Sequence, residues 1–277
     1  MKTVDRAPRG AVTAVDVVTE GFPRTDSLVT ESPLQLVINN RRFAVLMRTP
    51  ATAIDSDIHL ALGFMYSEGI IDDVDDVTAI GYCVDQANLN RHNTMRVQLH
   101  DGGGLNERLK NTYRSTSVSS ACGSCGRIDA LELLTTFPNR SVYSVPRIDF
   151  VQRLPALLRQ QQSIFDETGG IHGAAVVDQT GELILVAEDI GRHNAVDKVI
   201  GEALSDHGLD LEGNVLVVSS RISFDIVQKA LRADLSTVVG VGAASSLAHE
   251  LAQHHGLHLF SFTRSDRTNS HTIPKVL

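Results

Sequence analysis

Two cysteines that lie three positions apart are the residues of this chain best suited to chemistry. Cys122 and Cys125 fall within residues 117–127, a run rich in Ser and Gly that lacks a helical or strand period. Such a composition is typical of an exposed, mobile loop. The thiolate is the reactive form of cysteine, and C-x-x-C pairs often have a lowered thiol pKa. Three interpretations are open: a dithiol that handles redox equivalents or sulfur, which we favour, half of a zinc site, or a pair without a chemical task.

The other residues of the sequence do not complete a metal site of known spacing. Zinc usually takes four ligands, but the third cysteine, Cys83, stands alone, and no second C-x-x-C or C-x-x-C…H-x-x-x-H spacing occurs. Iron–sulfur clusters usually need four thiolates, and the chain has three cysteines. A thioredoxin-like site would follow an apolar strand, which residues 112–116 do not form. We therefore predict no resident metal.

A second group of polar residues follows the strands expected in the C-terminal half. Ligands of α/β sheets bind beyond the carboxyl ends of the strands. Residues 188–194, 220–223 and 242–246 each bring small or hydrogen-bonding residues to the start of a helix. Unpaired backbone N–H groups and the helix dipole favour anions there. The side chains that we expect at this edge of the sheet are His172, Arg192, His193, Arg221 and Lys229.

Each of these residues alone has a plainer explanation. An isolated arginine or lysine is usually a solvated surface charge, and an isolated histidine is often a structural one. Three helix starts with the same chemistry instead favour a ligand that carries phosphate. Neither a Walker A motif nor G-x-G-x-x-G is present, so the sequence disfavours ATP and NAD.

The elements that must position these residues indicate an α/β protein, α+β overall. We expect residues 1–30 to be a partly loose tail with a short edge strand, and residues 31–110 to be a smaller α+β domain. Residues 111–127 are the C-x-x-C loop. Residues 128–277 alternate strands and helices, which predicts a mostly parallel sheet covered by helices. The strands expected there are 174–177, 182–187, 215–219, 237–241 and 257–262. The helices expected along the chain begin at Asp55 or Ser56 and, further on, span 129–137, 150–166, 192–204, 223–233 and 245–255.

Composition excludes several classes of function. The chain has 277 residues, a 42% hydrophobic fraction that suits a globular core, and a net charge of −8 that disfavours general binding to nucleic acid or anionic membranes. No run reaches the ~18 apolar residues that a membrane helix needs, and no signal-peptide layout opens the chain. Three cysteines fit a reducing compartment better than a disulfide scaffold. We therefore expect a cytoplasmic protein.

Several longer motifs occur in a specific order. They are residues 48–50 (RTP), 60–71, 122–126 (CGSCG), 168–175 (TGGIHGAA), 188–198 (EDIGRHNAVDK), 219–221, 227–230 and 246–252. Over residues 31–272 the chain resembles the formate dehydrogenase accessory sulfurtransferase family, FdhD/NarQ. The resemblance implies a sulfur carrier that takes persulfide sulfur from a cysteine desulfurase. The carrier passes it to Mo-bis(molybdopterin guanine dinucleotide), or its tungsten equivalent, for the catalytic subunit of formate dehydrogenase.

The resemblance also implies roles for individual residues and a fold. Cys122 matches the family's persulfide carrier, and Cys125 would assist or relay. Residues 128–277 would form a cytidine-deaminase-like three-layer domain, and the protein would be a homodimer. The deaminase zinc motif, H-x-E with P-C-x-x-C, is absent, because His172 is followed by glycine and alanine. GDP would mimic the bound cofactor.

The family's cofactor-binding segment matches the stretch near the C-terminus, with one departure. Many members have Gly-Gly before the second arginine, where this chain has Ser265 and Asp266. The two arginines remain to contact phosphate, whereas the added carboxylate opposes a polyanion. Two other functions stay open, a non-catalytic cofactor-binding chaperone and a zinc nucleotide deaminase-like hydrolase. The residues of the segment are Phe262, Thr263, Arg264, Ser265, Asp266 and Arg267.

Overall fold

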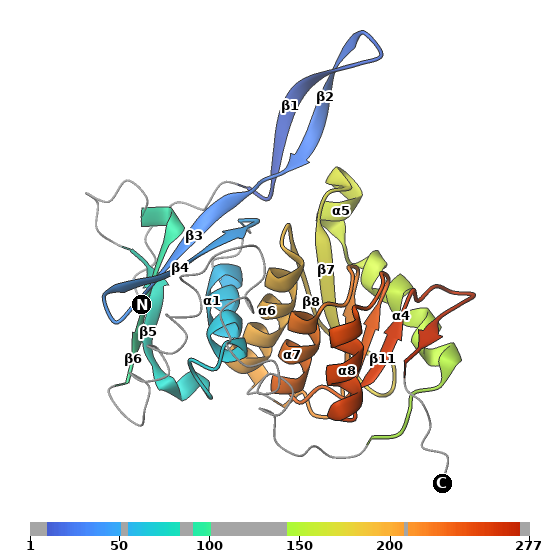
Figure 1. Ribbon diagram of the computed structural model, residues 1–277. Coiled ribbons are helices and arrows are strands. Elements are labelled where there is room, and N and C mark those ends of the chain that lie inside the picture. The colour runs from blue at the N-terminus through green and yellow to red at the C-terminus, as the bar shows by residue number, and fades with distance from the viewer. Residues whose placement is uncertain (1–9, 51–54, 84–90, 101–142, 208–209, 272–277) are drawn as a thin grey trace.

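The computed structural model describes residues 10–50, 55–83, 91–100, 143–207 and 210–271. They form three sheets with helices packed between and around them (Figure 1). A two-stranded sheet pairs β1 with β2, a four-stranded sheet has the order β4-β3-β6-β5, and a six-stranded sheet has the order β12-β11-β10-β9-β7-β8. The mixed α/β class predicted from the sequence is confirmed. The predicted C-x-x-C loop, with Cys122 and Cys125, and the predicted helix 129–137 lie outside the described residues.

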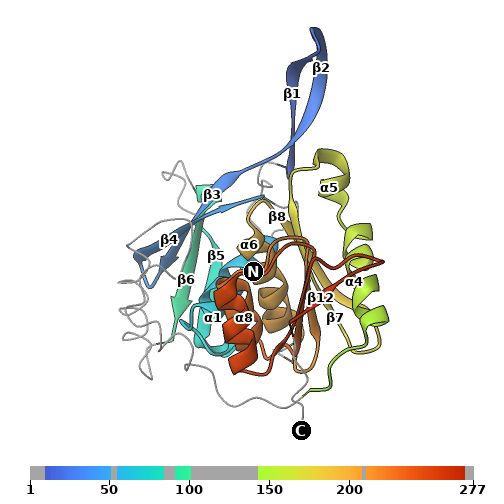
Figure 2. The ribbon, with the colours of Figure 1, turned by 45° about the vertical axis from the view of Figure 1, so that its right-hand side comes forward.

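The first sheet is a hairpin of β1 (Val12–Thr19) and β2 (Phe22–Val29) that projects from the body (Figures 1 and 2). Glu20 and Gly21 join the strands with φ of +52° and +87°. A turn with two positive φ values matches the twist of a hairpin. The sequence predicted only a short edge strand in a partly loose tail. The second strand was missed because Phe22–Val29 includes Pro23 and has no apolar alternation.

The second sheet holds β3 (Ser32–Ile38), β4 (Arg41–Arg48), β5 (Val77–Tyr82) and β6 (Thr94–Leu99). The predicted hairpin turn is confirmed, since Asn39 and Asn40 both have positive φ between β3 and β4. Asparagine tolerates this region better than most residues. Alternate residues of β3, such as Leu34 and Leu36, are buried in the core that the sheet shares with α1 (Asp55–Ser67). The short 3-10 helices Val74–Asp76 and Arg91–Asn93 precede β5 and β6.

The third sheet combines a parallel centre with antiparallel neighbours. Strands β9 (Val215–Val218), β10 (Thr237–Gly240) and β11 (His258–Ser261) are parallel. β7 (His172–Val177) is antiparallel to both β8 (Leu183–Asp189) and β9, and β12 (Asn269–Ser270) is antiparallel to β11. The mostly parallel sheet predicted from sequence is therefore correct only for the centre. The reason is the tight turn at 178–181, which reverses the chain after β7.

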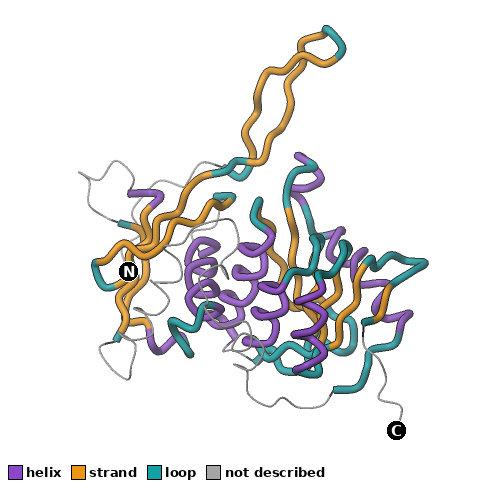
Figure 3. The backbone as a smooth tube through the Cα atoms, in the orientation of Figure 1, coloured by secondary structure: helices purple, strands orange, loops and turns teal. Residues whose placement is uncertain are grey.

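Helices cover both faces of this sheet and make three layers (Figure 3). One face packs on α6 (Arg192–Glu202), α7 (Phe224–Arg232) and α8 (Ser246–His254). The other face packs on α4 (Ile148–Gln160), so alternate strand residues belong to two separate hydrophobic clusters. The single helix predicted over 150–166 is two helices, α4 and the short α5 (Ser163–Thr168). A π-helical turn, Ala203–His207, continues α6.

Candidate functional site

Five strand ends meet along one edge of the six-stranded sheet. In the register, His172 at the start of β7 lies opposite Asp189 at the end of β8, and Ala174 pairs with Val218 at the end of β9. Val218 in turn lies beside Gly240 at the end of β10. The loops after β8, β9, β10 and β11 therefore leave the sheet on the same side, as expected for a ligand-binding edge. We call this edge, with its loops 188–194, 219–223, 241–246 and 262–267, the rim.

His193 is the most enclosed histidine of the rim. Its Nε2 lies 3.3 Å from Ser223 Oγ, and 3.6 Å from Asp225 Oδ2. Burial lowers the pKa of His193 to about 4, and the Arg192 guanidinium acts in the same direction. Asp225 opposes these effects but does not outweigh them. His193 is therefore neutral at neutral pH, so that one ring nitrogen can accept and the other can donate a hydrogen bond.

Arg192 carries the positive charge of this part of the rim. Its charge contributes to lowering the pKa of both His172 and His193, so all three side chains lie near one another. Burial is the larger cause for His172. The Nε atom of Arg192 is buried and has no hydrogen-bond partner among the described residues. A buried donor without a partner is costly, and an anion would satisfy it.

Arg221 follows β9 and is exposed at the rim. Its loop is held against the loop after β10, because Ile222 donates a backbone hydrogen bond of 2.8 Å to the carbonyl of Ala243. A Cβ on Gly242 would lie 2.8 Å from the backbone nitrogen of Arg221, so the close approach of the two loops requires glycine there. The Arg221 side chain is thus presented from a rigid backbone.

The segment 262–267 lies beside the loop that follows β10. Phe262 and Thr263 donate backbone hydrogen bonds to Gly242 and Gly240, at 2.9 and 3.1 Å. Arg264 donates from Nη1 to the carbonyl of Val241 at 2.8 Å, and its own N–H reaches the carbonyl of Arg267. The structure therefore places the predicted segment on the same rim as Arg192 and Arg221. The side chains of Phe262, Ser265, Asp266 and Arg267 are exposed, Arg264 is half-buried and Thr263 is buried.

Lys229 differs from the predicted ligand-binding residues at the rim because its side chain is buried. Its Nζ lies 2.7 and 2.9 Å from the two carboxylate oxygens of Asp197, which also accepts from Ser67 Oγ at 2.8 Å. Burial alone would lower the pKa of Lys229, but the carboxylates of Asp197, Glu68 and Asp225 together outweigh burial and raise that pKa. The ammonium is thus engaged between α6, α7 and α1. We assign Lys229 a structural part rather than a ligand contact.

Four residues of this region were not singled out from sequence. Ser223 and Asp225 contact His193, and Asp189 and Thr49 hold the turn before Arg192. Asp189 and Thr49 did occur in the RTP and EDIGRHN motifs, but their partners lie 140 positions apart. The motifs were the signal, and only the tertiary structure shows that the two segments contact each other.

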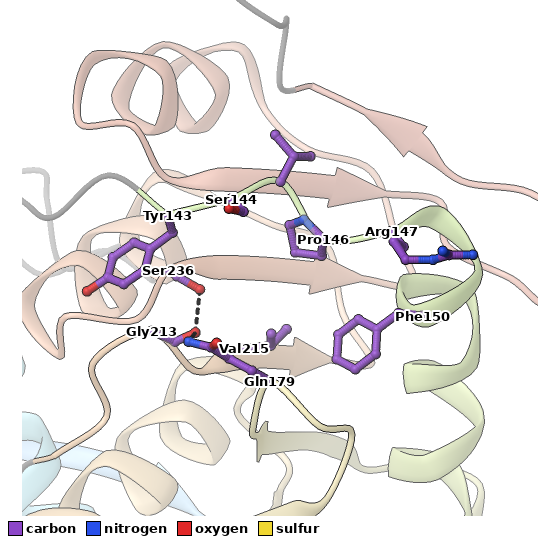
Figure 4. Close-up of a pocket in the computed structure, with 10 residues that line it drawn as sticks. Tyr143, Ser144, Pro146, Arg147, Phe150, Gln179, Gly213, Val215 and Ser236 are labelled. Carbon is purple, nitrogen blue, oxygen red and sulfur yellow. Dashed lines mark hydrogen bonds between the residues drawn. The ribbon is translucent and has the colours of Figure 1, made fainter.

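Two further features lie away from the rim. Cys83, the third cysteine, is buried at the end of β5, and its backbone N–H donates to Thr94. A cavity of about 470 Å³ lies where β9 and β10 begin, at the opposite edge of the sheet from the rim (Figure 4). Phe150 and Ser236 line it, and none of the predicted site residues does. In the described ranges, no three His, Cys, Asp or Glu side chains gather closely enough to hold a metal ion.

Comparison with known proteins identifies the family. The sequence model of the FdhD/NarQ family matches residues 29–277. The chain belongs to the FdhD/NarQ family. Sulfur carrier protein FdhD of Corynebacterium efficiens is 38% identical over 252 residues, which are 89% of each chain. Sulfur carrier protein FdhD of Sulfolobus acidocaldarius is 36% identical and covers 90% of each chain.

A solved structure has the same fold as this FdhD/NarQ chain. It is a formate dehydrogenase accessory protein from Desulfotalea psychrophila, with a TM-score of 0.69 and 20% identity. The alignment covers 97% of this chain and 99% of that one. In this FdhD/NarQ chain, no helix of the described ranges has both the length and the apolar character needed to cross a membrane.

Proposed function

We propose that this protein is a sulfur carrier for formate dehydrogenase. It accepts persulfide sulfur from a cysteine desulfurase and delivers it to Mo-bis(molybdopterin guanine dinucleotide), or the tungsten equivalent. Family membership and the relatives named sulfur carrier protein support the sulfur-transfer role. The C-x-x-C pair supplies the reactive thiols, and the rim supplies a site for a large anionic substrate. We propose that it works in the cytoplasm as a homodimer.

The chemistry assigned to the cysteines is thiol exchange. The Cys122 thiolate attacks the terminal sulfur of the donor's persulfide, the donor's S–S bond breaks, and the donor cysteine leaves as a thiolate. For delivery, the Cys125 thiolate attacks Sγ of Cys122, a disulfide forms between them, and the outer sulfur leaves as hydrosulfide. The two thiols supply the two electrons that this reduction of sulfur needs. In this scheme Cys125, three positions from Cys122, releases the sulfur that Cys122 carries.

The observation that carries the substrate assignment is the unsatisfied donor of Arg192 on a rim of further donors. Its buried Nε has no partner among the described residues, and two neutral histidines with hydrogen-bonding nitrogens lie beside it. Arg221 and Arg267 are exposed on the loops that follow β9 and β11 at the same rim. Arginine suits phosphate because its planar fork donates two parallel hydrogen bonds. The two guanine nucleotides of the cofactor carry such phosphates.

The test of the carrier role is mass analysis of the protein after incubation with a cysteine desulfurase and cysteine. We expect Cys122 to gain one sulfur atom that reductant removes, and Cys122→Ala to gain none. Cys83→Ala is the matched control, because Cys83 is buried and should leave the adduct unchanged. Cys125→Ala should accept sulfur but release hydrosulfide slowly. Stoichiometric zinc without an adduct would instead support the deaminase-like hydrolase.

A second test separates a carrier from a non-catalytic cofactor chaperone. Formate dehydrogenase would be produced in cells that contain only Cys122→Ala in place of the natural protein. We expect the dehydrogenase to be inactive although the variant still binds GDP in calorimetry. Full dehydrogenase activity with this variant would show that binding alone suffices, and the carrier role would be wrong. Light scattering of the purified protein measures whether it is the proposed homodimer.

A further inference from the structure

The end of β4 makes a two-way contact with the turn between β8 and α6. The backbone N–H of Thr49 donates to Asp189 Oδ2 at 3.1 Å, and the N–H of Ile190 donates to Thr49 Oγ1 at 3.1 Å. Thr49 and Asp189 are both buried, with 1% and 0% of their surface exposed. Two segments 140 residues apart thus satisfy each other's polar groups where water has no access. If either residue were replaced, the polar groups of the other would be buried without a hydrogen bond, which is energetically costly.

Asp189 extends this contact into the turn that carries the rim residues. Its Oδ1 accepts from the N–H of Gly191 at 2.8 Å and from Nδ2 of Asn194 at 2.9 Å. Its Oδ2 lies 2.8 Å from Nζ of Lys198, one turn further along α6. The carboxylate of Asp189 therefore accepts hydrogen bonds from the residue after β4, from the turn and from α6. A carboxylate with several donors is held in a single orientation.

The end of β4 is also held from the other side. Nδ2 of Asn194 donates to the carbonyl of Met47 at 2.7 Å, and Nζ of Lys198 donates to the carbonyl of Thr49 at 3.3 Å. The four-stranded sheet is therefore joined by hydrogen bonds in both directions to α6 and to the turn that precedes it. Between the anchored residues 190 and 194 lie Arg192 and His193. Gly191, at the start of α6, has no side chain to cap the helix.

We propose that Thr49 and Asp189 are positioning residues for the anion site at Arg192 and His193. Neither side chain touches the ligand. They hold the turn that carries Arg192, whose buried Nε has no hydrogen-bond partner among the described residues, which spares the ligand the cost of ordering the turn. The four-stranded sheet, through Thr49, thereby completes a site that lies at the edge of the six-stranded sheet. This inference rests on the proposed function for the identity of the ligand, for which GDP is the probe.

The test compares two substitutions at Thr49 and two at buried carboxylates. Thr49→Val removes Oγ1 at nearly the same volume, whereas Thr49→Ser retains it. Asp189→Asn removes the charge, and Asp57→Asn does the same to a carboxylate of α1 that is equally buried but pairs with Arg48. GDP affinity is measured by calorimetry well below each variant's unfolding temperature. Amide hydrogen exchange at Ile190 and Gly191 is measured on the same samples.

We expect Thr49→Val and Asp189→Asn to bind GDP at least fivefold more weakly and to exchange these amides at least tenfold faster. Thr49→Ser and Asp57→Asn should stay within twofold of the natural protein in both measurements, although Asp57→Asn unfolds at lower temperature. Equal affinity in Thr49→Val and Thr49→Ser would overturn the positioning role. If the natural protein does not bind GDP, the proposed ligand is wrong. The exchange rates then decide separately whether Thr49 and Asp189 hold the turn.

Discussion

Gly63 of α1 and Gly201 of α6 lie backbone against backbone where the two helices cross. A Cβ atom on Gly201 would lie 2.7 Å from the nitrogen of Gly63 and 1.8 Å from the carbonyl oxygen of His59. A Cβ atom on Gly63 would lie 1.8 Å from the carbonyl oxygen of Asp197. No side chain fits at this crossing. This close crossing brings α1, and with it the four-stranded sheet, near enough to α6 for Thr49 to reach Asp189.

Alanine at either glycine should therefore destabilise the protein severely. We expect Gly63→Ala and Gly201→Ala each to lower the free energy of unfolding by about 3 kcal/mol or more, because the helices must separate. Gly81→Ala in β5 is the control, since nothing lies within 4 Å of its Cβ position. That control should stay within about 1 kcal/mol of the natural protein. Urea unfolding gives all three values, and a small loss for Gly63→Ala would contradict the close crossing.

Lys229 and Arg221 should respond in opposite ways to loss of their charge. Lys229→Met leaves Asp197 buried without its cation, so the free energy of unfolding should fall by about 3–5 kcal/mol. Arg221→Met changes an exposed side chain and should alter stability by less than about 0.5 kcal/mol. Its GDP affinity should instead fall about tenfold, because a charged hydrogen bond to phosphate is lost. Urea unfolding and calorimetry on both variants separate the two roles.

Acid should destabilise the protein through His193. The pKa of His193 is lowered to about 4 in the folded state by burial, with Arg192 acting in the same direction, against about 6.5 when unfolded. The unfolded state therefore binds the proton more readily, and stability falls as the pH drops from about 6.5 to about 4. The loss attributable to this group is on the order of 3 kcal/mol at most.

The pH dependence can be assigned with one substitution. Urea unfolding of the natural protein and of His193→Gln at pH 7.5, 6 and 5 gives the comparison. The charged and titratable groups that act on His193 are Arg192, Asp225, Lys229 and His172, and all remain in the variant. We expect the natural protein to lose more stability than His193→Gln between pH 7.5 and 5. Parallel curves would show that other groups account for the acid sensitivity.

Asp266 should weaken the binding of a polyanion to the rim. Its carboxylate is exposed in the segment 262–267, between Arg264 and Arg267. We expect Asp266→Asn to bind GDP about two- to fivefold more tightly at low salt, and the gain to vanish at high salt, because exposed charges are screened. Ser265→Asn is the neutral neighbour control and should leave affinity unchanged. A gain that persists at high salt would indicate a rearranged segment instead of a charge effect.

Local patterns in the sequence determined many of the elements and part of the site. The turn at Asn39 and Asn40, the helix that starts at Asp55 and the apolar central strands were all predicted, because turn residues, helix starts and apolar runs act within a few positions. The grouping of His172, Arg192 and His193 also followed from sequence. Arg192 and His193 follow the end of β8, and His172 begins β7, which the tight turn at 178–181 pairs antiparallel with β8, so that all three lie at one edge of the sheet.

Only the tertiary structure decided which of these polar residues are buried and which remain available. Arg221 lies in the loop before α7 and is exposed, whereas Lys229 lies in the last turn of α7 and is enclosed by α1 and α6. The antiparallel pairing of β7 with β9 and the contact of Thr49 with Asp189 likewise join segments far apart in the chain. Such pairings depend on packing between whole elements. A short window of sequence does not reveal these pairings, because the two partners lie far apart in the chain and each is buried only when the other packs against it.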